Sequence, residues 1–121
     1  MRQFGAIVLV VEDEPVQRMG LIAIVEEAGY QAVEAADADQ AVAILERRTD
    51  IRIVLADIDM PGSMDGLRLA ALVRDRWPPI EIIVTSGGRV PALERIPARA
   101  VFLPKPLNER RVRDQLARFA S

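Results

Sequence analysis

Short apolar runs alternate with amphipathic stretches along the whole chain, and this alternation most restricts what the chain can fold into. The first run, residues 6–11 (AIVLVV), is continuous and rich in β-branched residues, as is typical of a strand buried on both faces. Four further runs predict strands at residues 31–35, 51–56, 81–86 and 100–104.

Amphipathic segments with helical spacing separate these runs. Apolar residues three or four positions apart mark a helix after Pro15 that ends at Gly29, and a last helix that begins near Asn108. Asp37 and Gln40 resemble a capping box that opens a second helix. A third helix is predicted before the proline pair at residues 78–79.

The segment before the fifth strand is poor helix-forming sequence. Glycines at 87 and 88 and prolines at 91 and 97 leave only about residues 91–96 for a helix, which is under two turns. We therefore predict a short or irregular fourth helix. We expect residues 87–99 to be the most mobile part of the free protein, since so short a helix is marginal without packing.

Strictly alternating strands and helices predict an α/β fold, with a parallel sheet covered by helices on both faces. In open sheets of this kind, ligands bind beyond the carboxyl ends of the strands. Polar residues collect at these ends in the sequence: Glu12 and Asp13, then Asp57, then Thr85 and Ser86, and finally Lys105.

Three clustered carboxylates repel one another unless a cation joins them, and oxygen-only ligands suit magnesium, with manganese as an alternative. An aspartate carboxylate is a known nucleophile toward phosphorus, and phosphoryl transfer needs chiefly positioning and charge neutralisation. The strand ends therefore predict a site where Asp57 accepts a phosphoryl group, aided by a metal, Lys105 and the Thr85 hydroxyl.

The composition excludes several other kinds of site. The chain of 121 residues contains no cysteine and no histidine, which rules out disulfides, thiol nucleophiles, serine–histidine triads and imidazole-ligated zinc. No apolar run approaches the roughly 18 residues of a membrane span, and the N-terminus lacks signal-peptide features, so the cytoplasm is the expected compartment. A net charge of −2 argues against nucleic acid as a direct partner. Lys105 is the only lysine among sixteen basic residues.

Four motifs occur in order on the predicted elements: VVEDE, DIDMPGSMDG, VTSG and FLPKP. With them the chain resembles the receiver domain of two-component response regulators, similar to the single-domain chemotaxis type, over essentially residues 1–121. The resemblance implies a five-stranded sheet of flavodoxin-like order 2-1-3-4-5. It also implies a signalling domain rather than an enzyme, with only slow self-catalysed phosphotransfer and dephosphorylation.

The resemblance also implies roles for individual residues. Asp57 would be the phosphoacceptor, and the Lys105–Pro106 bond would often be cis. The metal would be bound by Asp13, Asp57 and the backbone carbonyl of Asp59, with Glu12 acting mostly through water. The phosphoryl-binding and switch residues would be Thr85, Ser86, Lys105 and Phe102, the last changing rotamer with Thr85.

The implied partners are a sensor histidine kinase or phosphotransfer protein and a downstream protein, with no nucleic acid or membrane, and a monomer or weak dimer is expected. Two departures from the family pattern concern the site itself. Glu12 stands where aspartate is more frequent, and the loop from Asp57 to Gly66 is one residue longer than usual, through Gly62 and Ser63.

Two other readings of the sequence remain open. Asp57 and Asp59 resemble the nucleophile and acid of haloacid-dehalogenase-type phosphatases, which also use magnesium. In those enzymes, however, the motif lies on the first strand, and here it lies on the third and is followed by Met60. The second alternative is an interaction module that is not phosphorylated, against which the intact set of strand-end residues argues.

Overall fold

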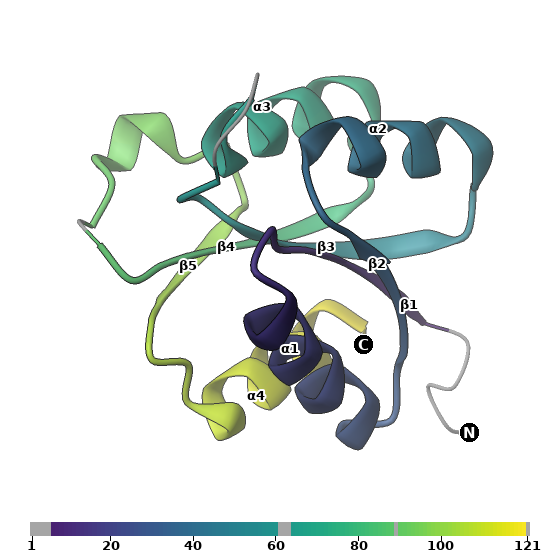
Figure 1. The fold of residues 1–121 in the computed structure, drawn as a ribbon. Coiled ribbons are helices and arrows are strands. Elements are labelled where there is room, and N and C mark those ends of the chain that lie inside the picture. The colour runs from purple at the N-terminus through teal and green to yellow at the C-terminus, as the bar shows by residue number, and fades with distance from the viewer. Residues whose placement is uncertain (1–5, 61–63, 89, 121) are drawn as a thin grey trace.

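The computed structural model describes residues 6–60, 64–88 and 90–120, and strands and helices alternate along them (Figure 1). The elements in chain order are β1 (Ile7–Val11), α1 (Pro15–Glu27), β2 (Gln31–Ala35), α2 (Ala38–Arg47), β3 (Ile51–Asp57), α3 (Gly66–Arg76), β4 (Glu81–Ser86), η1 (Leu93–Arg95), β5 (Val101–Pro104) and α4 (Glu109–Ala120). The five strands form one parallel sheet of order β2-β1-β3-β4-β5. This confirms the predicted fold class and strand order.

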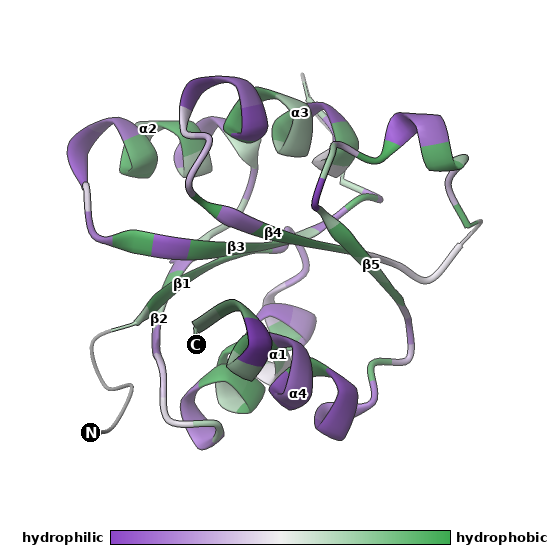
Figure 2. Cartoon of the chain, turned by 180° about the vertical axis from the view of Figure 1, so that it is seen from behind, coloured by the Kyte–Doolittle hydropathy of each residue, from purple (hydrophilic) through white to green (hydrophobic). Residues whose placement is uncertain are grey.

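Helices cover both faces of the sheet, with α2 and α3 on one side and α1 and α4 on the other (Figure 1). Successive residues of β1 enter different cores, Leu9 packing with the α2 and α3 residues and Val10 with those of α1 and α4. Figure 2 shows hydrophobic residues along the strands and hydrophilic residues on the outer sides of the helices. All positions of β1 are buried, which is why its sequence is continuously apolar.

Polar side chains cap the first turns of the helices. The α2 cap is Asp37, whose carboxylate accepts from the Gln40 N–H at 2.8 Å, as the capping box predicts. The Gln40 side chain accepts in return from the Ala36 N–H at 2.9 Å, one residue before the cap. Among the described residues no helix is of a length and apolarity that would let it cross a membrane.

Among the residues described between β4 and β5 (87–88 and 90–100), the three-residue 3₁₀ turn η1 is the only helical element, which confirms the prediction of a short or irregular fourth helix. Its hydrogen bonds are local, from the Arg95 N–H to the Ala92 carbonyl and from the Ile96 N–H to the Leu93 carbonyl. Val90 and Leu93 are 73% and 84% exposed, so these side chains add little packing energy to the turn.

The end of this segment, in contrast, is attached to the rest of the fold by two arginines. The Arg74 side chain, at the end of α3, donates to the carbonyl oxygens of Ala98, Pro78 and Ile80, each at 2.8 Å. Arg99 donates to the same Pro78 carbonyl at 3.2 Å. Burial lowers the pKa of Arg74, as does the neighbouring positive charge of Arg99. The chain just before β5 is therefore tied to the loop that precedes β4.

Candidate functional site

Three carboxylates meet at the carboxyl ends of β1 and β3. Glu12 and Asp13 directly follow β1, Asp57 is the last residue of β3, and the two strands are neighbours in the sheet. Oxygen atoms of the three side chains lie within 4.8 Å of one another. Glu12 and Asp57 are only 1% and 3% exposed. The spacing and the all-oxygen donor set fit a hard divalent cation such as magnesium.

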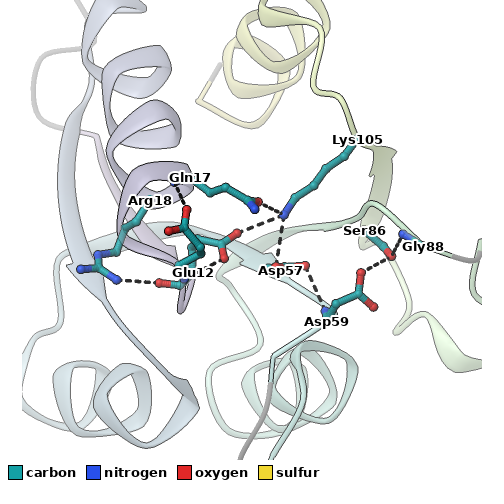
Figure 3. Close-up of polar contacts among 9 residues, drawn as sticks. Glu12, Gln17, Arg18, Asp57, Asp59, Ser86, Gly88 and Lys105 are labelled. Atoms are coloured by element: carbon teal, nitrogen blue, oxygen red, sulfur yellow. Dashed lines mark hydrogen bonds and ion pairs between the residues drawn. The ribbon is translucent and has the colours of Figure 1, made fainter.

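Lys105, which directly follows β5, supplies positive charge to this cluster (Figure 3). Its Nζ donates to Glu12 Oε1 at 3.1 Å and to Asp57 Oδ2 at 3.2 Å. Burial lowers the pKa of Lys105, but the hydrogen bonds to both carboxylates and their negative charges outweigh it, so the pKa is raised overall. The ammonium therefore stays charged at neutral pH.

Glu12 carries a carboxyl whose charged form is disfavoured at this site. Burial is the largest influence on this carboxyl and raises its pKa, and the negative charge of Asp57 acts in the same direction. Hydrogen bonds from the Glu14 N–H and from Lys105 oppose the rise without cancelling it. A carboxylate whose pKa is raised in this way favours a further cation nearby.

Both oxygens of Asp57 are held by hydrogen bonds. Oδ1 accepts from the Asp59 N–H at 3.0 Å, and Oδ2 accepts from Lys105. The Ile58 N–H donates to the Thr85 carbonyl at 2.7 Å, which continues the pairing of β3 with β4 beyond Asp57. The carboxylate therefore points in a defined direction from the end of a buried strand.

The side chains of Asp59 and Ser86 are paired with each other. The Ser86 hydroxyl donates to Asp59 Oδ2 at 2.6 Å and accepts from the Gly88 N–H at 3.0 Å (Figure 3). Ser86, which the sequence groups with the phosphoryl-binding residues, is thus directed to Asp59 in this structure. The contact also connects the β3 end of the site to the start of the segment that leads to η1.

Thr85 carries a buried hydroxyl that has no hydrogen-bond partner in the part of the chain that the structure describes. The residue is fully buried and is the register partner of Asp57 on the neighbouring strand. A buried polar atom without a partner costs about 1–3 kcal/mol, so such atoms are rare in native proteins. The Thr85 hydroxyl is therefore free to donate to an acceptor oxygen that comes within its reach.

The remaining residues expected at the site lie around this group. Phe102 lies on β5, pairs in register with Val84 and packs, half buried, against the core on the α2 and α3 side. The Lys105–Pro106 peptide bond is cis, as the resemblance implies. Gly62 and Ser63, which carry the expected extra loop residue, lie outside the described residues.

Three residues that contact the site were not identified from the sequence. Gln17 Oε1 accepts from Lys105 Nζ at 2.6 Å, and Arg18 donates to the Glu12 carbonyl at 2.9 Å. Gly66 begins α3 and lies against the backbone of Asp57 and Ile58. Gln17 and Arg18 follow the acidic pair by about one helical turn, and Gly66 is a poor helix former at a helix start, so each left a weak sequence signal.

Comparison with known proteins identifies the family. Residues 8–117 match the family described as "Response regulator receiver domain". This chain is a receiver domain. Members of this family are signalling domains of two-component systems rather than enzymes, and the acidic cluster of Glu12, Asp13 and Asp57 is typical of the family's magnesium site.

Individual relatives agree with this assignment. The receiver domain is 40% identical over 108 residues to "Sensor kinase CckA" of Brucella abortus, an alignment that covers 86% of this chain but only 11% of that protein. It is similar in structure to the receiver domain of the hybrid histidine kinase CckA, with 26% identity, a TM-score of 0.80, and 96% and 100% of the two chains covered. The fold also matches TrrA of Thermotoga maritima, solved in complex with Mg(2+)-BeF, with 24% identity, a TM-score of 0.83, and 94% and 98% coverage.

Proposed function

We propose that this receiver domain accepts a phosphoryl group on Asp57 from the phosphohistidine of a sensor histidine kinase or a phosphotransfer protein. The observation that carries the proposal is the surroundings of Asp57. Its carboxylate is oriented by the Asp59 N–H and lies beside the Lys105 ammonium. Its cross-strand neighbour is Thr85, whose hydroxyl has no partner among the described residues.

In the proposed transfer, a carboxylate oxygen of Asp57 forms a bond to phosphorus while the bond from phosphorus to the imidazole nitrogen breaks. The electron pair of the broken bond stays on the imidazole, and the product is an acyl phosphate on Asp57. Lys105 offsets the negative charge of the phosphoryl oxygens, and Thr85 donates its hydroxyl hydrogen to one of them. Lys105 already contacts Asp57, and Thr85 is the cross-strand neighbour of Asp57.

Magnesium, or manganese in its place, would be held by Asp13, Asp57 and the backbone carbonyl of Asp59, with Glu12 acting mostly through water. When bound, the metal supplies positive charge to the phosphoryl oxygens and to the crowded carboxylates. The raised pKa of Glu12 and the all-oxygen cluster support a cation at this place. The Mg(2+)-BeF complex of the structurally similar TrrA supports it as well.

The phosphoryl group would act as a switch on a protein-docking surface. Thr85 would move its hydroxyl toward the phosphoryl group, and Phe102 and Ser86 would change position with it. Asp57 accepts from the Asp59 N–H, and Ser86 contacts both Asp59 and Gly88, so hydrogen bonds connect Asp57 with the start of the segment before η1. The downstream partner would be a protein that reads this surface, and residues 1–121 would act as one receiver unit that is monomeric or weakly dimeric.

The proposal is tested by incubating the protein with magnesium and either acetyl phosphate or phosphoramidate, followed by intact-mass spectrometry. One phosphoryl group is expected on the wild type and none on Asp57→Asn. Equal labelling of both proteins would overturn the assignment. Rapid multiple turnover on phosphomonoesters would instead favour an aspartate-nucleophile phosphatase, and no labelling of a folded wild type would favour a non-phosphorylated interaction module.

A further inference from the structure

The Lys105 ammonium has a third acceptor that does not belong to the carboxylate cluster. Nζ donates to Glu12, to Asp57 and to the side-chain oxygen of Gln17 (Figure 3). An ammonium has three N–H donors and no acceptor, so these three oxygens match its full donor capacity. Gln17 lies in the first turn of α1.

The neutral acceptor makes the shortest of the three contacts. Hydrogen bonds from an ammonium to a carboxylate are usually about 2.7–2.9 Å long. The contacts to Glu12 and Asp57 are longer, at 3.1 and 3.2 Å, whereas the contact to Gln17 is 2.6 Å. The ammonium therefore lies closest to the Gln17 oxygen while it keeps hydrogen bonds to both carboxylates.

The backbone of Gln17 is held at a capped helix start, its side chain is exposed, and open space adjoins the lysine. The Gln17 backbone N–H donates to the Glu14 carboxylate at 2.8 Å, so the residue belongs to a capped helix start. A pocket of about 540 Å³ lies between α1 and the chain that follows β5, with Gln17, Gly20, Gly87 and Lys105 among its lining residues. The pocket leaves open space beside Lys105 on the side of α1.

Of the two carboxylates that Lys105 contacts, Asp57 would bind magnesium directly and Glu12 would act on it mostly through water. A cation bound at Asp57, with Glu12 acting mostly through water, competes with the ammonium for the negative charge of these two carboxylates. We propose that Gln17 is a positioning residue that receives the Lys105 ammonium when magnesium engages these carboxylates, and that it thereby strengthens magnesium binding. This inference rests on the proposed metal site and deepens the proposed function.

The test measures the magnesium dissociation constant by calorimetry, without a phosphoryl donor. Gln17→Met keeps the length of the side chain and removes the acceptor, Gln17→Glu keeps an acceptor oxygen, and Gln115→Met makes the same exchange on α4 as a control. We expect Gln17→Met to weaken magnesium binding by about three- to tenfold, the range of one hydrogen bond. Gln17→Glu and Gln115→Met should bind at least as tightly as the wild type.

Gln17→Met is also made in a Lys105→Ala background. This double variant shows whether Gln17 acts by positioning the Lys105 ammonium or through a general effect on the structure. If Gln17 acts through Lys105, Gln17→Met should change magnesium affinity little once the ammonium is gone. The inference is overturned if Gln17→Met binds magnesium like the wild type, if Gln17→Glu is weakened equally, or if the loss persists without Lys105. Labelling of Asp57 by acetyl phosphate is scored separately, so a wild type that is not labelled but shows the Gln17 effect contradicts only the proposed function.

Discussion

Gly66 lies directly against the backbone of Asp57, so the start of α3 and the end of β3 touch without a side chain between them. A β-carbon at Gly66 would meet the Asp57 carbonyl group and come within 2.7 Å of Ile58 Cα, closer than real β-carbons approach backbone atoms. The Gly66 N–H also donates to the Ile58 carbonyl at 3.2 Å. The position of the proposed phosphoacceptor thus depends on a residue that carries no functional group.

Gly66→Ala is expected to lower the free energy of unfolding by about 2 kcal/mol or more, because backbone must move to admit the methyl group. Phosphorylation by acetyl phosphate should slow as Asp57 shifts. Gly20→Ala is the control, since a β-carbon at Gly20 in α1 would have no heavy atom within 4 Å and should stabilise the helix by about 0.5–1 kcal/mol. Urea denaturation measures both. Equal midpoints for the two variants would contradict the proposed role of Gly66.

Thr85→Val should weaken the response to phosphorylation without lowering the free energy of unfolding. Valine has nearly the shape of threonine, and the Thr85 hydroxyl has no partner among the described residues, so its removal should be neutral or stabilise the fold by about 1 kcal/mol. The variant should respond less than the wild type to beryllium fluoride, measured by NMR shifts around Phe102. Thr85→Ser keeps the hydroxyl and is expected to keep the response. An unchanged response in Thr85→Val would show that the hydroxyl is not used.

Lys105 is expected to balance the carboxylates before any metal binds. Lys105→Ala leaves Glu12 and Asp57 without their shared cation, and we expect a loss of about 2 kcal/mol in unfolding free energy, less than for a fully buried pair. Millimolar magnesium should restore much of this loss, because the metal binds only the folded site. Thermal unfolding with and without magnesium measures the effect. A loss that magnesium leaves unchanged would argue against a shared site for the two cations.

Lys105→Arg keeps the charge but replaces a compact ammonium with a planar fork. We expect partial phosphorylation of Asp57 and a weakened conformational response. Intact-mass spectrometry measures the labelling, and NMR with beryllium fluoride measures the response. If Lys105→Ala responded to beryllium fluoride as fully as the wild type, Lys105 would have no part in activation.

The contacts of Arg74 indicate that only the first part of residues 87–99 is mobile in the free protein. Residues 98–100 are held through the carbonyl of Ala98, whereas residues 90–96 have the local bonds of η1 and exposed side chains. Hydrogen exchange should therefore be faster at residues 90–96 than at 98–100 in the free protein. Arg74→Lys cannot reproduce the planar set of contacts and should bring residues 98–100 to the faster rate.

The matched control is Arg76→Lys, which alters an exposed arginine that pairs with Glu46 and stacks on Trp77. It should leave exchange at residues 98–100 unchanged. If residues 98–100 exchange as fast as η1 in the wild type, the Arg74 contacts do not restrict this segment. Exchange repeated with magnesium and beryllium fluoride then tests whether residues 87–99 become ordered on activation.

The carboxylate cluster was predictable because parallel strands bring their carboxyl ends to one edge of a sheet. The apolar runs locate the strands, so reading the residue after each run was enough to group Glu12, Asp57 and Lys105. The irregular segment before β5 was predictable for a different reason, since glycine and proline limit helix length whatever the surroundings.

Contacts between side chains of separate elements could not be predicted from apolar runs and strand ends. Gln17 is one of many polar residues on an exposed helix face, and nothing in its spacing indicates that it reaches a lysine 88 positions away. The missing partner of Thr85 and the contacts of Arg74 with three carbonyls depend likewise on how separate elements pack. Periodicity assigns a residue to a face, but it does not determine which atoms meet there.

The two cores on opposite sides of the sheet have a consequence for how related chains can diverge. Leu9 and Val10 are adjacent, yet each packs against a different pair of helices, with the sheet lying between them. A substitution on one side therefore changes the surroundings of one helix pair and leaves the other nearly untouched. Related chains that share the chemistry at the end of β3 can thus acquire new recognition surfaces on one side of the sheet, without compensating substitutions in the core on the other side.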